Sequence, residues 1–382
     1  MKNKKWSKKD IAFLKGNYSV YTNNELAEEL DRTVSAIEKK AGKLGLYKQI
    51  LGKFDDDRHL LKARTESNVT KKKYKEALLE NDRLRDEKEA ILRIQETPQE
   101  IRFTQRQNGG SDATAFIIAS DWHIEETVNP SDVSGLNSYN LRISEERAKR
   151  FFSSALKLLK ITQKESRVNQ VVLALLGDFI SGHIHLELLE NNTLLPADAI
   201  WRVQNYLISG INFLLNNSKI ELTIVCHGGN HGRMTQRIHH ATEQGNSLEV
   251  YMYNNIALYF KGNKRINFMI AEGYHTYLDV YGYKVRLHHG HAIRYAGGVG
   301  GIFIPVNKAI AQWNKGRTVD LDVFGHFHQF KDGGNFICNG SLIGYNAFAL
   351  SIKADYEKPK QAFFLVDKKR GKSIVAPIWL LK

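Results

Sequence analysis

The chain has 382 residues, of which 42% are hydrophobic, and a formal net charge of +14. This length suits one large domain with a smaller one, and the hydrophobic content is ample for a core. No stretch reaches the roughly 18 apolar residues that a membrane helix needs, and no apolar signal-peptide core follows the basic N-terminus, so we expect a cytoplasmic protein without a membrane partner. The positive charge favours a polyanionic partner.

Residues 1–50 carry a net charge of +5 and predict a small helical domain. Ser7 stands where an N-cap begins a first helix, and Asn23 or its neighbour can cap a second one. A third helix over residues 33–46 places apolar side chains on one face and lysines on the other. Gly45 is a suitable residue to end that helix.

Three short helices with a basic third one are typical of a helix-turn-helix domain, whose last helix can enter the major groove of DNA. The loose pattern W-S, L-A-x-x-L, R-T-x-x-A-I and K-x-x-x-L-G-L resembles the Myb-like and helix-turn-helix domains that are often fused to phage and bacterial nucleic-acid enzymes. The resemblance implies a DNA-binding domain, and the pairing of domains suggests a phage-encoded protein. It places at the DNA the side chains of Arg32, Ser35, Lys39 and Lys43. The alternative is a protein-docking module with merely solvated lysines.

Residues 51–112 are expected to link this domain to the remainder of the chain. The first part of the linker is strongly charged and rich in helix formers, and Pro98 ends it. Between residues 70 and 95 a seven-residue spacing permits a short coiled coil that would join two copies of the chain. That spacing is carried by Ala77, Leu84 and Ile91. A solvated helical spacer is the alternative.

From residue 113 to residue 382 the pattern changes to strands that alternate with helices. Nearly continuous apolar runs predict strands at residues 113–120, 170–179, 220–230, 264–272, 283–291, 319–326, 335–343 and 361–367. Amphipathic helices are predicted at residues 147–161 and 197–215. Parallel strands joined through helices imply an α/β sandwich, in which ligand sites gather at the C-terminal ends of strands.

Five short motifs lie where apolar runs of this domain end. They read Asp121-Trp122-His123, Gly177-Asp178, Gly229-Asn230-His231, His288-His289-Gly290-His291 and Gly325-His326-Phe327-His328. Each motif supplies oxygen or imidazole ligands of the kind that hold catalytic divalent metals. Of the 14 histidines, only His59 precedes residue 120, which places the metal chemistry in this domain.

Hydrolysis of a phosphodiester needs an activated water, neutralised phosphoryl oxygens and a stabilised leaving oxygen. Two metal ions about 3.5–4 Å apart can supply all three, and a bridging carboxylate can hold them that close. Asp178 follows a glycine at a strand end and is the natural bridge. A protonated imidazole nearby can donate to the leaving oxygen. The donor set suits Mn²⁺ first, and Fe²⁺, Zn²⁺ or Mg²⁺ as alternatives, better than Ca²⁺.

The order of the motifs over about residues 113–370 resembles the calcineurin-like metallophosphoesterase superfamily, which hydrolyses phosphate esters with two metal ions. The resemblance implies a metallophosphoesterase β-sandwich flanked by helices. It assigns one metal to Asp121, His123 and His328. It assigns the second metal to Asn230, His289 and His326, with Asp178 between the two ions. His231 matches the catalytic histidine that contacts the scissile phosphate or protonates the leaving group.

One position departs from the family pattern. The family usually has Asp or Glu after Gly-Asn-His, whereas Gly232 follows His231 in this chain. A carboxylate that could orient His231 would therefore have to come from elsewhere. Arg233 and His183 are placed to bind phosphate, although each can equally be an ordinary loop residue.

The metal motifs, the charge and the N-terminal helices together favour a DNA endonuclease or exonuclease, similar in chemistry to the double-strand-break repair nucleases of the superfamily. Against this, only 54 residues follow His328, so we expect no sizeable capping domain of the kind that nuclease relatives often carry. A phosphatase or small-nucleotide phosphodiesterase with a regulatory DNA- or protein-binding arm is the second hypothesis. A DNA-binding regulator with a vestigial phosphoesterase site is the third.

Overall fold

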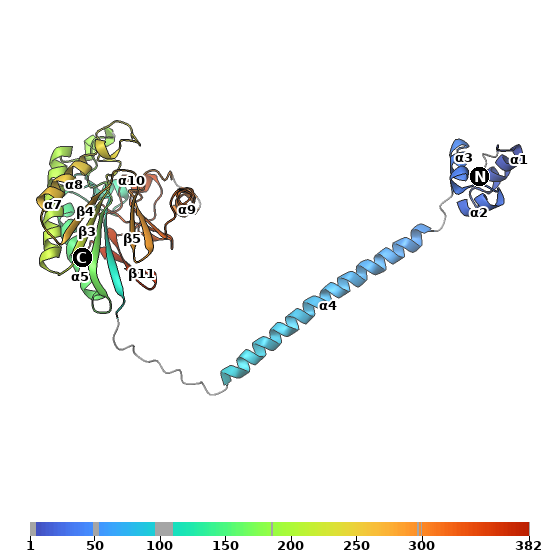
Figure 1. Ribbon diagram of the computed structural model, residues 1–382, viewed down its shortest axis with the longest axis horizontal. Coiled ribbons are helices and arrows are strands. Elements are labelled where there is room, and N and C mark those ends of the chain that lie inside the picture. The colour runs from blue at the N-terminus through green and yellow to red at the C-terminus, as the bar shows by residue number, and fades with distance from the viewer. Residues whose placement is uncertain are drawn as a thin grey trace. The chain divides into compact units, whose positions relative to one another are not determined.

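The computed structural model describes residues 5–48, 53–95, 110–184, 186–295, 298 and 300–381. Contacts within the chain divide it into two units, Met1–Thr104 and Gln105–Lys382, both drawn in Figure 1. Within the described ranges, no helix is both long and apolar enough to cross a membrane.

Three short helices open the first unit: α1 (Lys8–Asn17), α2 (Asn23–Glu29) and α3 (Val34–Lys43). Ser7 caps α1, as the sequence predicts. The cap of α2 is Thr22, and not Asn23 or its neighbour, because Thr22 and Glu25 form a reciprocal capping box. Gly45 follows α3 with a φ of +66°, the left-handed conformation that commonly ends a helix.

A small apolar core holds these three helices together. Leu14, Leu26 and Ile37, one from each helix, are completely buried.

The long helix α4 (Lys53–Gln95) follows in the first unit. Its described side chains are exposed, and they include Leu61, Tyr74 and Leu84. Residues 53–95 of the expected linker are thus helical, whereas its role as a linker and its pairing with a second copy stay predictions.

The second unit contains a six-stranded sheet with the strand order β11-β10-β1-β2-β3-β4. Its strands are β1 (Asp112–Ala119), β2 (Arg167–Leu175), β3 (Glu221–Cys226), β4 (Ile266–Ile270), β10 (Lys360–Asp367) and β11 (Gly371–Trp379). Strands β1 to β4 are parallel to one another, and β10 runs antiparallel to both of its neighbours.

A second sheet has the strand order β5-β6-β7-β9-β8. Its strands are β5 (Thr276–Val280), β6 (Tyr283–Leu287), β7 (Leu321–Phe324), β8 (Lys331–Asp332) and β9 (Phe336–Cys338). Strands β6, β7 and β9 are parallel, whereas β5 and β8 pair antiparallel at the two edges. Both sheets are therefore mixed.

Alternation along β1 shows how the layers pack. Ala115 and Ile117 belong to a core shared with the helices, whereas Phe116 and Ile118 belong to the core between the two sheets. Such alternation is expected of a strand that is covered on both faces. The helices on the first sheet are α5 (Leu141–Thr162), α7 (Pro196–Asn216) and α8 (Leu248–Tyr259).

Helix α9 (Phe303–Trp313) covers the outer face of the second sheet, where Val306 and Ile310 pack against Phe324 and Phe336. Figure 1 shows α7 and α8 on one side of the two sheets and α9 on the other. The predicted α/β sandwich flanked by helices is confirmed. The short elements are the 3-10 turns Pro130–Val133 and Gln244–Asn246 and the helices α6 (Leu186–Asn191) and α10 (Ala347–Ser351).

Candidate metal centre

Each of the five motifs begins within three residues of the end of a strand, as the sequence predicts. Strands β1, β2, β3, β6 and β7 end at Ala119, Leu175, Cys226, Leu287 and Phe324. Five residues of these motifs have a left-handed backbone conformation that few non-glycine residues adopt, with φ between 45° and 70°. They are Asp121, His123, Asp178, His326 and His328. Residues held in the left-handed region cost free energy and tend to cluster at functional sites.

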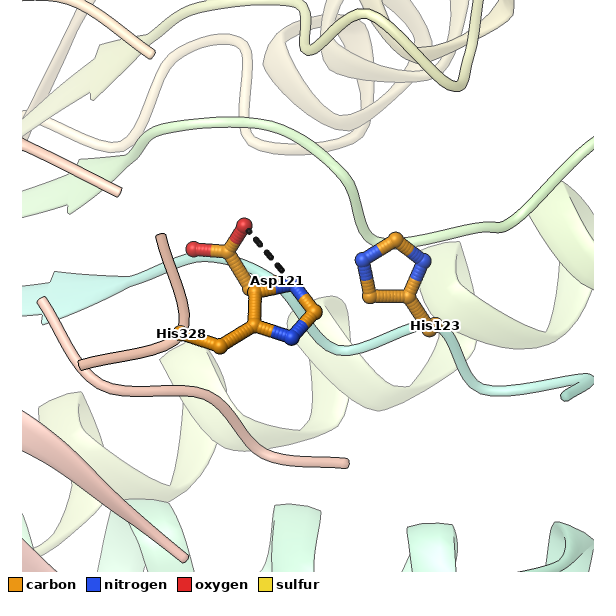
Figure 2. A group of neighbouring side chains, drawn as sticks. All are labelled: Asp121, His123 and His328. Atoms are coloured by element: carbon orange, nitrogen blue, oxygen red, sulfur yellow. Dashed lines mark ion pairs between the residues drawn. The ribbon is translucent and has the colours of Figure 1, made fainter. Parts of the chain in front are cut away.

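The first cluster consists of Asp121, His123 and His328, whose ligand atoms all lie within 4.8 Å of one another (Figure 2). All three residues are buried. Nε2 of His123 and Nδ1 of His328 are buried without a hydrogen-bond partner among the described residues. Because a buried polar atom without a partner is costly, these nitrogens fit a cation that would accept their lone pairs.

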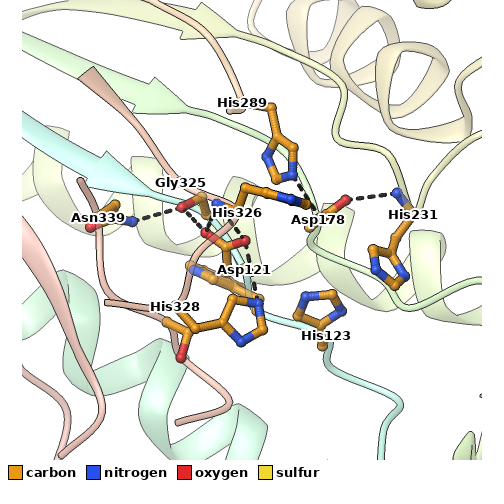
Figure 3. Close-up of polar contacts among 12 residues, drawn as sticks. Asp121, His123, Asp178, His231, His289, Gly325, His326, His328 and Asn339 are labelled. Atoms are coloured by element: carbon orange, nitrogen blue, oxygen red, sulfur yellow. Dashed lines mark hydrogen bonds and ion pairs between the residues drawn. The ribbon is translucent and has the colours of Figure 1, made fainter. Parts of the chain in front are cut away.

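The second cluster consists of Asp178, His289 and His326, whose ligand atoms likewise all lie within 4.8 Å of one another. Nε2 of His289 lies 2.8 Å from the Asp178 carboxylate (Figure 3). It also lies 3.1 Å from Oδ1 of Asn230, so Asn230 belongs to this group. His289 donates from Nδ1 to the carbonyl of Leu176, which leaves Nε2 as its ligating atom. The structure thus brings together all seven predicted ligands in two adjacent groups.

The charges of these clusters suit a cation. Burial, with the neighbouring His231 and His328, holds the pKa of His123 well below its ordinary value, so the ring is neutral and can ligate. Burial opposes ionisation of Asp178, but His289 and His231 outweigh it and hold the pKa of Asp178 well below its ordinary value. Burial also opposes a charged His289, yet Asp178 raises its pKa to about 10. Positive charge is therefore strongly stabilised at this point.

His123 is oriented by a hydrogen-bond chain that the sequence did not reveal. Its Nδ1 lies 3.0 Å from Oγ of Ser181, and that hydroxyl donates to Glu126 at 3.1 Å. The other Glu126 oxygen accepts from Asn346 at 3.1 Å. When the second ring nitrogen of a histidine ligand donates a hydrogen bond in this way, its tautomer and ring orientation are fixed, which strengthens metal binding.

Asp121 is oriented by a second chain (Figure 3). Asn339 donates to Oγ of Ser120 at 2.8 Å, and Ser120 donates to the Asp121 carboxylate at 2.5 Å. The backbone N–H of His326 donates to both Asp121 oxygens at 3.0 Å. Two loops that are far apart in the sequence are thereby fixed around one carboxylate.

The departure at Gly232 has a structural reason. Glu249 of α8 is completely buried and accepts hydrogen bonds from the backbone N–H groups of Phe179 and Gly229, at 2.6 and 2.7 Å. A Cβ on Gly232 would lie 2.6 Å from Cγ of Glu249. The space beside Gly232 is thus filled by a carboxylate from α8, which binds the loops that carry Asp178 and Asn230. Burial, with the Asp178 charge, raises the pKa of Glu249 to about 7.

Two contacts that help to position His231 involve Asp178 and Ser181. The backbone N–H of His231 donates to Oδ1 of Asp178 at 2.8 Å, and its Nδ1 lies 2.9 Å from the carbonyl of Ser181. Because a carbonyl only accepts, Nδ1 carries a proton. The His231 ring centroid is 4.9 Å from that of His123, so the predicted catalytic histidine lies beside the first cluster.

The two predicted phosphate ligands line a small cavity of about 280 Å³ that also borders His231. His183 is exposed there. The guanidinium of Arg233 donates to the carbonyls of Asn230, Thr235 and Gln236 in its own loop. These bonds give Arg233 a clear structural role, and phosphate binding by either residue stays a prediction.

The two other histidines of the fourth motif lie outside the clusters found among the described residues. His288 is buried, stacks on Phe324 at 5.2 Å and lies 3.6 Å from Asp322. His291 lies 2.8 Å from Glu243. The choice of His289 over its neighbours as the ligand agrees with this arrangement.

The predicted DNA contacts of the first unit differ in their surroundings. Arg32 lies 4.0 Å above the Trp6 ring and bonds to Asp10 at 2.9 Å, and its side chain is only 5% exposed. Arg32 therefore stabilises the three-helix unit and offers little surface to a ligand. Three residues at a spacing of four form an exposed row on α3: Ser35, Lys39 and Lys43.

Several residues that position the cluster side chains or their loops could not be predicted from the sequence, because no motif marks them. Ser120, Ser181, Glu126 and Glu249 act through hydrogen bonds between loops. Ser120 adjoins a ligand in the sequence, which is the only local signal. Glu249 lies 70 residues from its partner Phe179, and only the fold brings the two together.

No protein-family model and no curated protein matches the chain. Among solved structures, it is similar to an archaeal phosphodiesterase (13% identity, 69% of this chain and 99% of that chain, TM-score 0.29). Vacuolar protein sorting 29 from Cryptosporidium parvum is 15% identical over 70% of this chain and 97% of that chain, with a TM-score of 0.29. A hypothetical protein from Pyrococcus horikoshii is 10% identical over 70% of this chain and 89% of that chain, with a TM-score of 0.35. At these scores, the function must be inferred from the site itself.

Proposed function

We propose that this chain is a two-metal phosphodiesterase of the calcineurin-like kind and that its substrate is DNA. The observation that supports the chemistry is the pair of largely buried clusters, Asp121-His123-His328 and Asp178-His289-His326, side by side at the strand ends (Figure 3). The donor set fits two divalent cations, Mn²⁺ first. When bound there, such ions would neutralise the phosphoryl oxygens and supply a water of lowered pKa.

The chain's own residues would perform the remaining work. Asp178 would be the carboxylate between the two ions. One of its oxygens lies beside His289 of the second cluster, and the other accepts from the backbone N–H of His231, whose ring lies beside His123 of the first cluster. In its imidazolium form, with Nδ1–H held by the Ser181 carbonyl, His231 would donate the Nε2 proton to the leaving oxygen. Ser120 and Ser181 would keep Asp121 and His123 in ligating orientations.

Two features support DNA as the substrate. The exposed row of Ser35, Lys39 and Lys43 lies on the third helix of a basic three-helix unit, where a helix-turn-helix protein presents its recognition helix. The net charge of +14 favours a polyanion. The first unit would thus bring the DNA to a phosphodiesterase in the second.

The test is incubation of the purified chain with Mn²⁺ and linear, circular or single-stranded DNA, beside bis-p-nitrophenyl phosphate. The control is Asp178→Asn. We expect cleavage of DNA and of the small ester, both lost in the variant. Cleavage of the circular DNA would identify an endonuclease. Hydrolysis of the small ester with intact DNA would overturn the nuclease and favour the second function.

That second function is a small-nucleotide phosphodiesterase or phosphatase with a regulatory arm. The observation in its favour is the cavity beside the clusters, whose volume of about 540 Å³ is in the range of small-ligand sites. A DNA-binding regulator without catalysis is the third candidate, and any metal-dependent turnover that Asp178→Asn abolishes would exclude it.

We further propose that α4 pairs with a second copy of the chain. Its exposed Leu84 lies in the seven-residue repeat, and Leu79, equally exposed, lies outside it. Sedimentation of the full chain over a range of concentrations should show a dimer. Leu84→Asp should shift it to monomer and the matched Leu79→Asp should not. Equal behaviour of both variants would argue against this helix as the interface.

A further inference from the structure

Two cavities meet at His231. The larger one, about 540 Å³, borders both clusters, and the smaller one, about 280 Å³, borders His183 and Met234. His231 lines both. A phosphate at the clusters therefore has room for a substituent on each side of the histidine, as a diester requires and a monoester does not.

The wall of the larger cavity carries one large apolar side chain that no catalytic role explains. Phe348 of α10 borders this cavity and remains 36% exposed. Its ring centroid lies 5.2 Å from that of His328 and 6.0 Å from that of His326. An exposed aromatic ring this close to the reacting position would contact the group attached to the phosphate.

The position of Phe348 is fixed by the same network that orients a ligand. Asn346 caps α10 by accepting from the N–H of Ala349 at 3.1 Å, and it donates to Glu126 at 3.1 Å. Glu126 in turn accepts from Ser181, the partner of His123. The helix that carries the ring is thus tied to the residues that orient the first cluster, which is what a specificity-determining side chain needs.

We propose that Phe348 stacks on the base of a nucleotide next to the scissile phosphate, so that the preferred substrate is an unstacked, single-stranded nucleic acid. Rings that stack on bases bind single strands with little sequence preference. A base inside a duplex is stacked and paired, and reaching Phe348 would cost that stacking. This inference rests on the proposed phosphodiesterase and adds its substrate class.

The test compares two p-nitrophenyl esters with the same leaving group, of thymidine 5′-phosphate and of methyl phosphate. Base stacking on one aromatic ring corresponds to a factor of about 10 in affinity. We therefore expect Phe348→Ala to raise KM about 10-fold for the thymidine ester, with kcat nearly unchanged. The methyl ester should be unaffected. Phe348→Trp should restore the low KM, and Leu350→Ala, an exposed leucine of the same helix, should match the wild type.

Each other outcome has a definite meaning. Equal losses on both esters, or no loss on the thymidine ester, would overturn the stacking and leave the phosphodiesterase intact. If the wild-type chain turned over neither ester, the proposed function would be overturned, and this inference with it. With oligonucleotides, a single strand should be cut faster than the blunt duplex, and the reverse order would contradict the substrate class.

Discussion

Gly232 and Glu249 share one small space: a Cβ at position 232 would stand 2.6 Å from Cγ of Glu249. The two residues therefore form a pair in which the missing side chain of one makes room for the buried carboxylate of the other. Glu249 uses that room to bind Phe179 N–H and Gly229 N–H, which border Asp178 and Asn230. An acidic residue at 232, as in the family pattern, is incompatible with this arrangement.

Gly232→Asp should consequently destabilise the second unit by about 1–3 kcal/mol, the usual cost of overpacking a filled core. Glu249→Ala should also destabilise it, because two backbone N–H groups lose their acceptor. The double variant should cost less than the sum of the single ones, since each change relieves the other. Urea unfolding of the three variants checks this, and strict additivity would show that the residues are not coupled.

The residues of the two clusters could be predicted because each follows an apolar run, and the ends of buried strands can be recognised locally. His289 and Asp178 are examples, since they lie within three residues of the ends of β6 and β2. The same rule could not reveal Glu249, which reaches Phe179 across 70 residues. Its helix α8 was also missed, because the apolar side chains of α8 do not keep to one face.

The predictions for the first unit show the same limit. The three helices could be predicted from caps and spacing, whereas the role of Arg32 could not. Arg32 looks like a DNA contact from its position in the pattern, but Asp10, 22 residues earlier, pairs with it in the folded unit. Side-chain partners across a fold are set by packing, and no local spacing reports them.

His231→Ala should lower turnover by about 10²–10⁴-fold, the usual contribution of a general acid, while the metal content is unchanged. The reason is that His231 meets Asp178 through its backbone N–H, which alanine retains. His240→Ala is the matched control, since His240 is exposed and lies on the same loop. Turnover and metal content by mass spectrometry should be measured together. Loss of metal from His231→Ala would make this residue a ligand.

Removal of the metals by a chelator should abolish turnover and lower the stability of the chain, and added Mn²⁺ should restore both. Binding to the native state alone at 100 times the dissociation constant would stabilise it by about 2.7 kcal/mol. In Asp178→Asn the stabilisation by Mn²⁺ should shrink, because the negative charge that raises the pKa of His289 to about 10 is lost. Thermal unfolding with and without Mn²⁺ measures this. Equal shifts in the two proteins would rule out Asp178 as a ligand.

The pairing of Arg32 with Asp10 should make the first unit sensitive to acid. The hydrogen bond from Arg32, aided by Ser7, lowers the pKa of Asp10 to about 2 from an ordinary 3.8. The stabilisation is therefore present above about pH 4 and is lost as the pH falls through 2. Amide hydrogen exchange of α1 to α3 in the full chain, corrected for intrinsic rates, should rise over that range. In Arg32→Ala the exchange should be faster at neutral pH and should rise less with acid, because only the Ser7 bonds to Asp10 remain. A wild-type acid response in this variant would contradict this role of Arg32.

The double variant Lys39→Ala/Lys43→Ala should weaken DNA binding because it loses contacts with phosphates. Arg32→Ala, in contrast, should act through the stability of the first unit. Both lysines are exposed on α3, so their loss should leave the helices intact and remove two phosphate contacts. The slope of log affinity against log salt should then fall in magnitude by about 1.8, because each contact with duplex DNA contributes about 0.9. The double Lys→Arg variant is the control and should retain the slope, since arginine keeps the charge. An unchanged slope in the alanine variant would mean that α3 does not face the phosphates, and that the unit is a module for docking onto protein.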